Sequence, residues 1–165
     1  MICTDILMEE HQVILKRMEV LRHDLDNGFP ENIDVIEKHC HFISTYADTF
    51  HHAKEEEIYF KWIAERNPSL QFGPILCMLG EHNSGRESVA KATDGIEKYR
   101  AGDESSLVNI KESLLSFINL IVDHISKEDE ILYKMAESIN DEYGGGDECM
   151  LPQFKKVVLP SSVSF

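Results

Sequence analysis

The chain has 165 residues, with 16 basic and 30 acidic side chains, and its formal net charge is −14 when its 8 histidines count as neutral. So acidic a composition excludes sequence-independent binding to nucleic acid or to an anionic membrane, because both require clustered lysine and arginine. Hydrophobic residues make up 42% of the chain, which is enough for a buried core, and the length suits one domain.

Neither membrane insertion nor export is expected from the sequence. No run approaches the roughly 18 apolar residues that a membrane span needs. The N-terminus lacks the basic and apolar regions of a signal peptide. The four cysteines are scattered without a CxxC pair, so we expect isolated thiols rather than disulfides and a location in the reducing cytoplasm.

Four segments repeat apolar residues every three or four positions, which is the spacing of an amphipathic helix. Their expected bounds are about 4–28, 30–67, 74–100 and 103–140. Thr4 or Asp5 suits the N-cap of the first segment, Pro30 the first turn of the second, and Asp103 the cap of the fourth. The connections between the segments are short, and no segment shows the alternating pattern of a β-strand. The sequence therefore predicts an all-α, up-down-up-down antiparallel four-helix bundle with a short C-terminal tail.

The expected boundary between bundle and tail lies near residue 140. Residues 1–140 would form the bundle domain, and residues 141–165 would form a glycine-containing linker and an apolar tail. The linker contains Gly144, Gly145 and Gly146. We expect the tail to dock back on the bundle; a contact between copies in a homo-oligomer, or a partner site, is the alternative.

Each of the four segments carries one histidine where its apolar stripe calls for a core residue. These histidines are His11, His51, His82 and His124. A single buried histidine is usually satisfied by a hydrogen bond, and without one it costs roughly 1–3 kcal/mol. A shared metal centre would satisfy all four at once.

The second and fourth segments also contain the same local pattern. Residues 51–61 align without gaps on residues 124–134, each with histidine, lysine at +3, glutamate at +4 and an apolar residue at +7. Four residues turn an α-helix by about 400°, so Glu55 lies over His51 and Glu128 lies over His124. Imidazoles and carboxylates converging from four helices suit iron, manganese or zinc.

One assignment within this pattern is ambiguous. His52 and Glu56 have the same spacing as His51 and Glu55, but His52 is rotated by about 100° from the core line. The repeated pattern therefore favours His51, and His52 would lie beside the ligands or be exposed. The remaining histidines, at positions 23, 39 and 41, are expected at the surface.

The order of a histidine, HxxxE, a histidine and a second HxxxE resembles the hemerythrin-like HHE cation-binding family. The resemblance covers about residues 4–139 and is carried by residues 5–11, 50–60, 81–86 and 124–135. It implies a non-haem di-iron centre with an oxo or hydroxo bridge, and zinc and manganese are the alternative metals. The four core histidines would be terminal nitrogen ligands, and Glu55 and Glu128 would bridge the two irons.

The sequence departs from the oxygen-carrying members in two places. Arg86 stands one helical turn after His82, where those members have a further histidine, and it would either pair with a carboxylate or lie at the mouth of the site. Asp129 occupies the spacing of their aspartate ligand, although the repeated pattern favours Glu128; whether Asp129 or Glu56 contributes stays open. Many members also have proline at positions 61 and 134, where this chain has lysine, which predicts straighter helices.

The resemblance implies a protein that binds or senses O₂ or a related small ligand, NO and peroxide included. Apolar neighbours at positions 14, 117, 121 and 131 would restrict access of water to the metal. The alternatives are a di-iron enzyme that acts on peroxide, O₂ or NO, and an iron-handling or iron-stress protein. The sequence predicts no catalytic residue beyond the metal ligands.

Overall fold

The computed structural model describes residues 1–163, and the secondary structure found in them is helical. Its elements are α1 (Ile2–Asn27), α2 (Ile33–Phe42), η1 (Ile43–His52), η2 (Glu55–Tyr59), α3 (Phe60–Arg66), η3 (Pro68–Phe72), α4 (Pro74–Arg100), α5 (Ser106–Lys127), η4 (Glu128–Leu132), α6 (Tyr133–Tyr143) and α7 (Gly146–Phe154). No helix in this part of the chain is long and apolar enough to cross a membrane.

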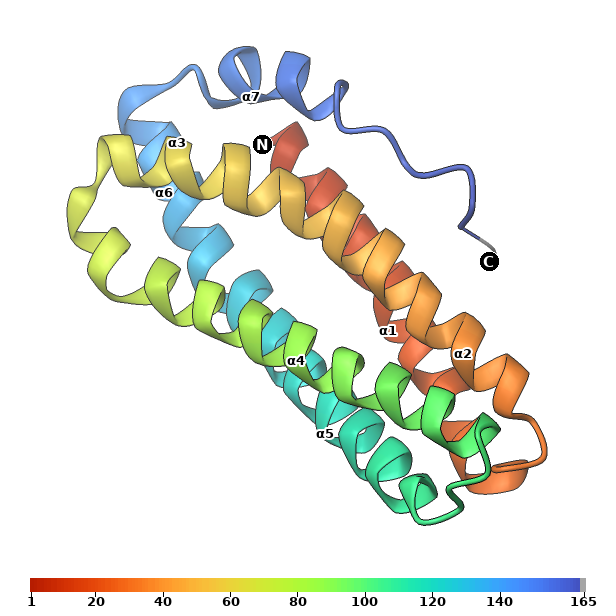
Figure 1. The fold of residues 1–165 in the computed structure, drawn as a ribbon. Helices are drawn as coiled ribbons and strands as arrows, with labels where there is room; N and C mark the ends of the chain where they lie inside the picture. The colour runs from red at the N-terminus through yellow and green to blue at the C-terminus, as the bar shows by residue number, and fades with distance from the viewer. Residues whose placement is uncertain (164–165) are drawn as a thin grey trace.

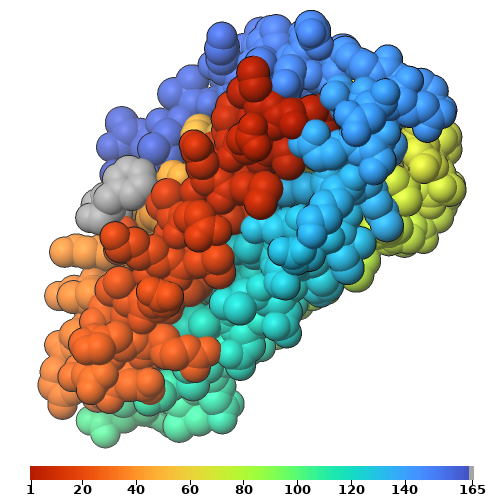
Figure 2. Space-filling view, turned by 180° about the vertical axis from the view of Figure 1, so that it is seen from behind, coloured from red at the N-terminus to blue at the C-terminus, as the bar shows by residue number. Residues whose placement is uncertain are grey.

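Four long helical stretches follow one another with alternating direction (Figure 1). The first is α1, the second runs from α2 to α3, the third is α4, and the fourth runs from α5 to α6. Figure 2 shows α1 lying beside α5 and α6 on one face of the molecule. The predicted all-α class is confirmed, and the third helix has the predicted bounds.

The expected tail contains a fifth helix, so four helices followed by a tail describe the chain only in part. The fourth stretch continues to Tyr143, and Gly144 and Gly145 follow with φ of 68° and 76°, which glycine adopts without steric cost. Helix α7 then lies across the end of the molecule where α1 begins (Figure 1). Its Met150 and Phe154 are buried in the core, and this segment therefore packs against the other helices.

Contact with α7 also explains why α1 begins earlier in the chain than the sequence predicts. The Asp147 carboxylate accepts hydrogen bonds from the backbone N–H of Ile2 at 2.8 Å and of Cys3 at 2.9 Å. These N–H groups have no partner within the helix, and a carboxylate at a helix N-terminus also interacts favourably with the helix dipole. Helix α1 consequently begins at Ile2 rather than being capped at Thr4 or Asp5.

The hydrophobic core is divided into two clusters, one toward each end of the long helices. One cluster contains Ile14, Met18, Leu21, Leu25, Ile36, Val89, Ile96, Ile110, Leu114 and Phe117 among others. The second contains Leu7, Ile58, Tyr59, Trp62, Ile63, Ile75, Leu132, Tyr133, Met150 and Phe154 among others. Buried histidines and glutamates are contributed by segments that lie between these clusters along the helices.

Both predicted histidine–glutamate patterns contain π-helical turns, although lysine replaces the expected proline after each of them. The π-turns are η1 and η2 in the second stretch and η4 in the fourth, and Lys61 and Lys134 lie in the α-helices that follow, α3 and α6. A π-turn bonds residue i to i+5 and accommodates one extra residue, which shifts the face that later residues present. Ile131 is therefore 50% exposed, whereas Leu132 and Tyr133 are buried. Ile131 does not shield the site as expected.

We expect this register shift to be visible in stability. Leu132→Ala should lower the free energy of unfolding by about 2–4 kcal/mol, because it removes a fully buried side chain. Ile131→Ala should lower it by less than about 1 kcal/mol, because that side chain is half exposed. Urea unfolding followed by circular dichroism measures both. An α-helical continuation through this segment would instead give Ile131→Ala the larger effect.

Candidate metal centre

Seven polar side chains converge in the interior between the two apolar clusters. They come from α1, η1, η2, α4, α5 and η4, and all are buried: His11, His51, His52, Glu55, His82, His124 and Glu128. The six residues predicted from the sequence are all among them. The seventh, His52, had been expected beside the ligands or exposed.

These side chains form two groups that each have the spacing of a metal site. One group is His11, His51, Glu55 and Glu128, and the other is His52, Glu55, His82 and His124. Within each group the potential ligand atoms all lie within 4.8 Å of one another. Because Glu55 belongs to both groups, the two sites are adjacent and share a carboxylate.

The two oxygens of Glu55 face different groups. Its Oε1 lies 3.5 Å from His51 Nε2 and 3.9 Å from His11 Nε2. Its Oε2 lies 3.5 Å from His82 Nε2, which belongs to the other group. A carboxylate in this position can bridge two cations.

Glu128 also lies between the groups. Its Oε2 is 3.1 Å from His124 Nε2 and 3.4 Å from His11 Nε2. Its Oε1 is 4.0 Å from His82 Nε2. Glu128 therefore contacts histidines of both groups, as the sequence pattern indicated for a second bridging residue.

Several of the inward-facing atoms have no hydrogen-bond partner among the described residues. They are His11 Nε2, His52 Nε2, Glu55 Oε2 and both carboxylate oxygens of Glu128. A buried polar atom without a partner costs about 1–3 kcal/mol, and more when it is charged. Nitrogen and carboxylate donors in this arrangement fit divalent iron, manganese or zinc, and cations between them would supply the missing interactions.

Every histidine of the centre is oriented from behind by a carboxylate. The Nδ1–oxygen pairs are His11–Asp129 at 2.7 Å, His51–Glu10 at 3.0 Å, His52–Asp48 at 3.3 Å, His82–Glu56 at 2.7 Å and His124–Glu81 at 3.0 Å. A carboxylate on the outer nitrogen fixes the ring orientation and leaves Nε2 free for a metal. Asp129 and Glu56, which the sequence left open, therefore contact the histidines from outside the two groups.

Three cations balance part of this outer layer of carboxylates. Lys54 pairs with Glu10, and Lys127 pairs with Glu81. The Arg86 guanidinium contacts Asp48 and Glu56, with its Nη2 at 2.7 Å from each. Arg86 thus supports two histidine–carboxylate pairs at the position where a further histidine ligand was considered, and it also lines a cavity that reaches the centre.

The carboxylates and cations of these three layers do not balance one another when the histidines are neutral. The two inner glutamates and five outer carboxylates carry seven negative charges, and Lys54, Lys127 and Arg86 carry three positive ones. With neutral histidines, four negative charges remain in a largely buried region. Two divalent cations would balance them, and uncompensated buried charge is strongly unfavourable.

The sequence did not predict that His52 belongs to the two groups, nor that Tyr133 contacts them. His52 was placed off the core line on the assumption of α-helical geometry, but the π-turn brings both His51 and His52 inward; its ring stacks on His82 with centroids 3.7 Å apart. Tyr133 donates a hydrogen bond from its hydroxyl to Glu55 Oε1 and stacks on His11 at 5.5 Å. For His52, the only signal in the sequence was the pair of consecutive histidines that precedes the glutamates.

The other histidines lie outside both groups. His23 and His41 are exposed, as expected. His39 is 1% exposed, contrary to the surface position that was expected, because it packs between helices and its Nε2 lies 2.9 Å from Asp24 Oδ2.

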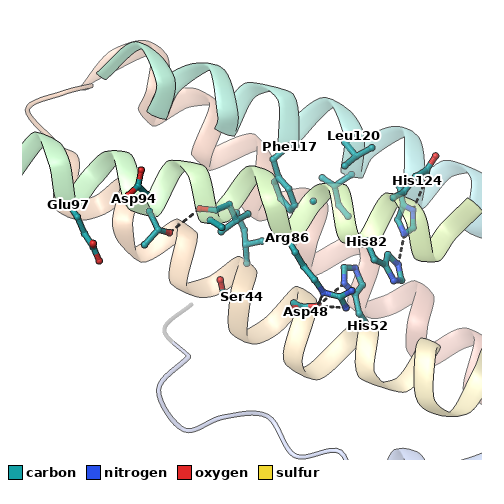
Figure 3. Close-up of a pocket in the computed structure, with 17 residues that line it drawn as sticks. Ser44, Asp48, His52, His82, Arg86, Asp94, Glu97, Phe117, Leu120 and His124 are labelled. Atoms are coloured by element: carbon teal, nitrogen blue, oxygen red, sulfur yellow. Dashed lines mark hydrogen bonds and ion pairs between the residues drawn. The ribbon is translucent and has the colours of Figure 1, made fainter. Parts of the chain in front are cut away.

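A cavity of about 560 Å³ reaches the centre beside one of the two groups. It is bounded by η1, α4 and α5, and His52, His82 and His124 line its inner end (Figure 3). His11 and His51 do not line it. The two groups therefore differ in access, because a small molecule in the cavity meets the His52–His82–His124 group first.

The protonation of the histidines in the metal-free chain follows from their surroundings. Burial lowers the pKa of His11, but its contacts with Asp129, Glu128 and Glu55 outweigh burial and raise the pKa to about 10. Burial likewise lowers the pKa of His124, and Glu128 and the other carboxylates around it raise the pKa to about 9. Burial, together with the neighbouring His82 and His51, outweighs the contact with Asp48 and lowers the pKa of His52 to about 4, so it is neutral at pH 7.

We therefore expect metal binding at pH 7 to release protons. His11 and His124 are protonated there without metal, and a coordinating imidazole must be neutral. Titration of Zn²⁺ into the metal-free chain, in two buffers of different ionisation enthalpy, should show release of two or more protons per chain, because the carboxylates around His51 raise its pKa as well. The apparent affinity should rise with pH up to about pH 10, the pKa of His11, as fewer protons compete. A heat of binding that does not depend on the buffer would contradict this.

Comparison with known proteins assigns the chain to a family. The family model described as the hemerythrin HHE cation binding domain matches residues 4–136, the part of the chain that contains all seven residues of the centre. Neither the curated proteins nor the solved structures compared with this chain contain a match. The match spans most of the sequence, and the chain therefore belongs to the hemerythrin HHE cation-binding domain family.

Proposed function

We propose that the chain holds two iron ions, bridged by Glu55 and Glu128, and that it binds or senses O₂ or a related small ligand. One observation carries this proposal: two groups of nitrogen and oxygen donors share Glu55, and their surroundings leave four negative charges that two divalent cations would balance. The cation-binding family supports the metal, and the mixed imidazole and carboxylate donors support iron.

When bound, such a pair of ions supplies open coordination positions and redox chemistry for a small ligand. The chain's own residues determine where that ligand can go. The cavity gives access beside His82 and His124, and Phe117 and Ile121 in its wall restrict water. On the opposite side Tyr133 covers His11 and holds Glu55 through its hydroxyl, so a ligand is expected only at the cavity side.

Iron loading tests the proposal. The metal-free chain should take up about two Fe(II) per chain without oxygen, and should then develop near-ultraviolet charge-transfer bands in air. His52→Ala should retain about one iron, because it removes a donor from the cavity-side group alone. The exposed His41→Ala is the matched control and should retain two. A wild-type chain that binds one iron or none, by metal analysis after desalting, would refute the proposal.

A second candidate is an enzyme that uses the same centre to turn over peroxide, O₂ or NO. The one-sided cavity favours it, because substrate can enter and product can leave at one group while the other stays enclosed. This candidate predicts many turnovers of peroxide or NO per iron-loaded chain. His82→Ala should lower the rate by more than about tenfold, whereas His41→Ala should leave it unchanged. A reaction that stops at one equivalent per centre would favour the binding or sensing role.

A further inference from the structure

The cavity beside the centre is much larger than a diatomic ligand requires. Its volume is about 560 Å³, whereas one water molecule has a share of only about 30 Å³ in the liquid. Sites for small organic molecules range from about 300 to 1,000 Å³ and are mostly apolar with a few placed polar groups. The size of this cavity therefore indicates a ligand of several carbon atoms.

Part of the wall between the two ends of the cavity is apolar. Ile43, Val89, Phe117 and Leu120 contribute to it, and Figure 3 shows Phe117 and Leu120 on this stretch. An aliphatic or aromatic body would gain there by being removed from water.

The two ends of the cavity differ in charge. At the inner end, beside His82 and His124, the charges of the metal-loaded centre are close to balance. At the outer end lie Asp94 and Glu97, on the far side of Arg86 from the histidines (Figure 3). Asp94 pairs with Lys98 at 2.7 Å, but Glu97 has no ion-pair partner among residues 1–163. The outer end therefore favours a cation.

The cavity is longer than a short alkyl chain. Glu97 and His82 are fifteen positions apart on the single helix α4, which corresponds to about 22 Å along its axis. Both side chains line the same cavity. A molecule of eight to ten carbons whose amine lies at Glu97 therefore places its apolar end in the middle of the cavity, short of the histidines.

We propose that this cavity binds a small organic amine, with its ammonium group at Glu97 and its apolar body in the middle of the cavity toward Phe117. The inference deepens the proposed function, on which it rests, because it names the class of organic ligand that the cavity side of the centre accepts. It requires binding alone and no chemical change of the amine.

Calorimetric titration with octylamine tests the proposal on the zinc-loaded and the metal-free chain. We expect one octylamine per chain, tighter binding than that of uncharged octanol, and, on the metal-free chain, weaker binding of octanoate, whose carboxylate Glu97 would repel. Glu97→Gln should lower the affinity for octylamine by about two- to fivefold, the range typical of the loss of an exposed ion pair. Glu87→Gln is the matched control, because Glu87 is exposed on the same helix but does not line the cavity, and it should bind like the wild type.

A second variant tests the location. Ala90 is exposed and lines the cavity between Arg86 and Asp94, so Ala90→Trp should fill the middle and abolish binding, with metal content and helicity unchanged. Equal affinities for octylamine and octanol, an unaffected Glu97→Gln variant, or binding that survives Ala90→Trp would each overturn the proposal. A chain that takes up no metal refutes the di-iron function instead, and octylamine binding to the metal-free protein still tests the cavity.

Discussion

The structure depends on how seven polar side chains are accommodated between two apolar clusters. Five imidazoles and two carboxylates are buried there, where unpartnered polar groups are costly and unbalanced charge more so. The chain meets this constraint in layers, because each imidazole has a carboxylate behind it and most of those carboxylates have a lysine or arginine behind them. The inward-facing atoms alone are left for cations.

This layering gives a physical role to charged residues that would otherwise count as surface. Glu10 and Lys54 form a buried pair behind His51, and Arg86 links the carboxylates behind His52 and His82. The strong negative charge of the sequence is thus partly located at the centre. There it would favour the binding of cations, in addition to whatever it contributes to solubility at the surface.

Local backbone geometry and tertiary contact then decide access to the centre. The π-turns allow the adjacent His51 and His52 to face different groups, and they bring Tyr133 rather than Ile131 toward the interior. One side of the centre is closed by Tyr133 stacked on His11, and the other opens into the cavity along α4. The π-turns in the second and fourth helical stretches thus help to form two adjacent groups of side chains, of which only one lines the cavity.

The sequence by itself determined the helical class, the bounds of most helices and six of the seven central residues. It could do so because burial repeats every three or four residues in a helix, and because a histidine and a glutamate four apart share one face. It misplaced His52, Ile131 and His39, and it anticipated neither α7 nor the capping of α1 by Asp147. Those features depend on π-turns and on contacts between residues far apart in the chain, which periodicity along one helix does not encode. Tertiary structure alone decided which carboxylate lies behind four of the five histidines and which group faces the cavity, because those partners come from different helices; only Asp48 lies on the same helical stretch as its histidine, His52.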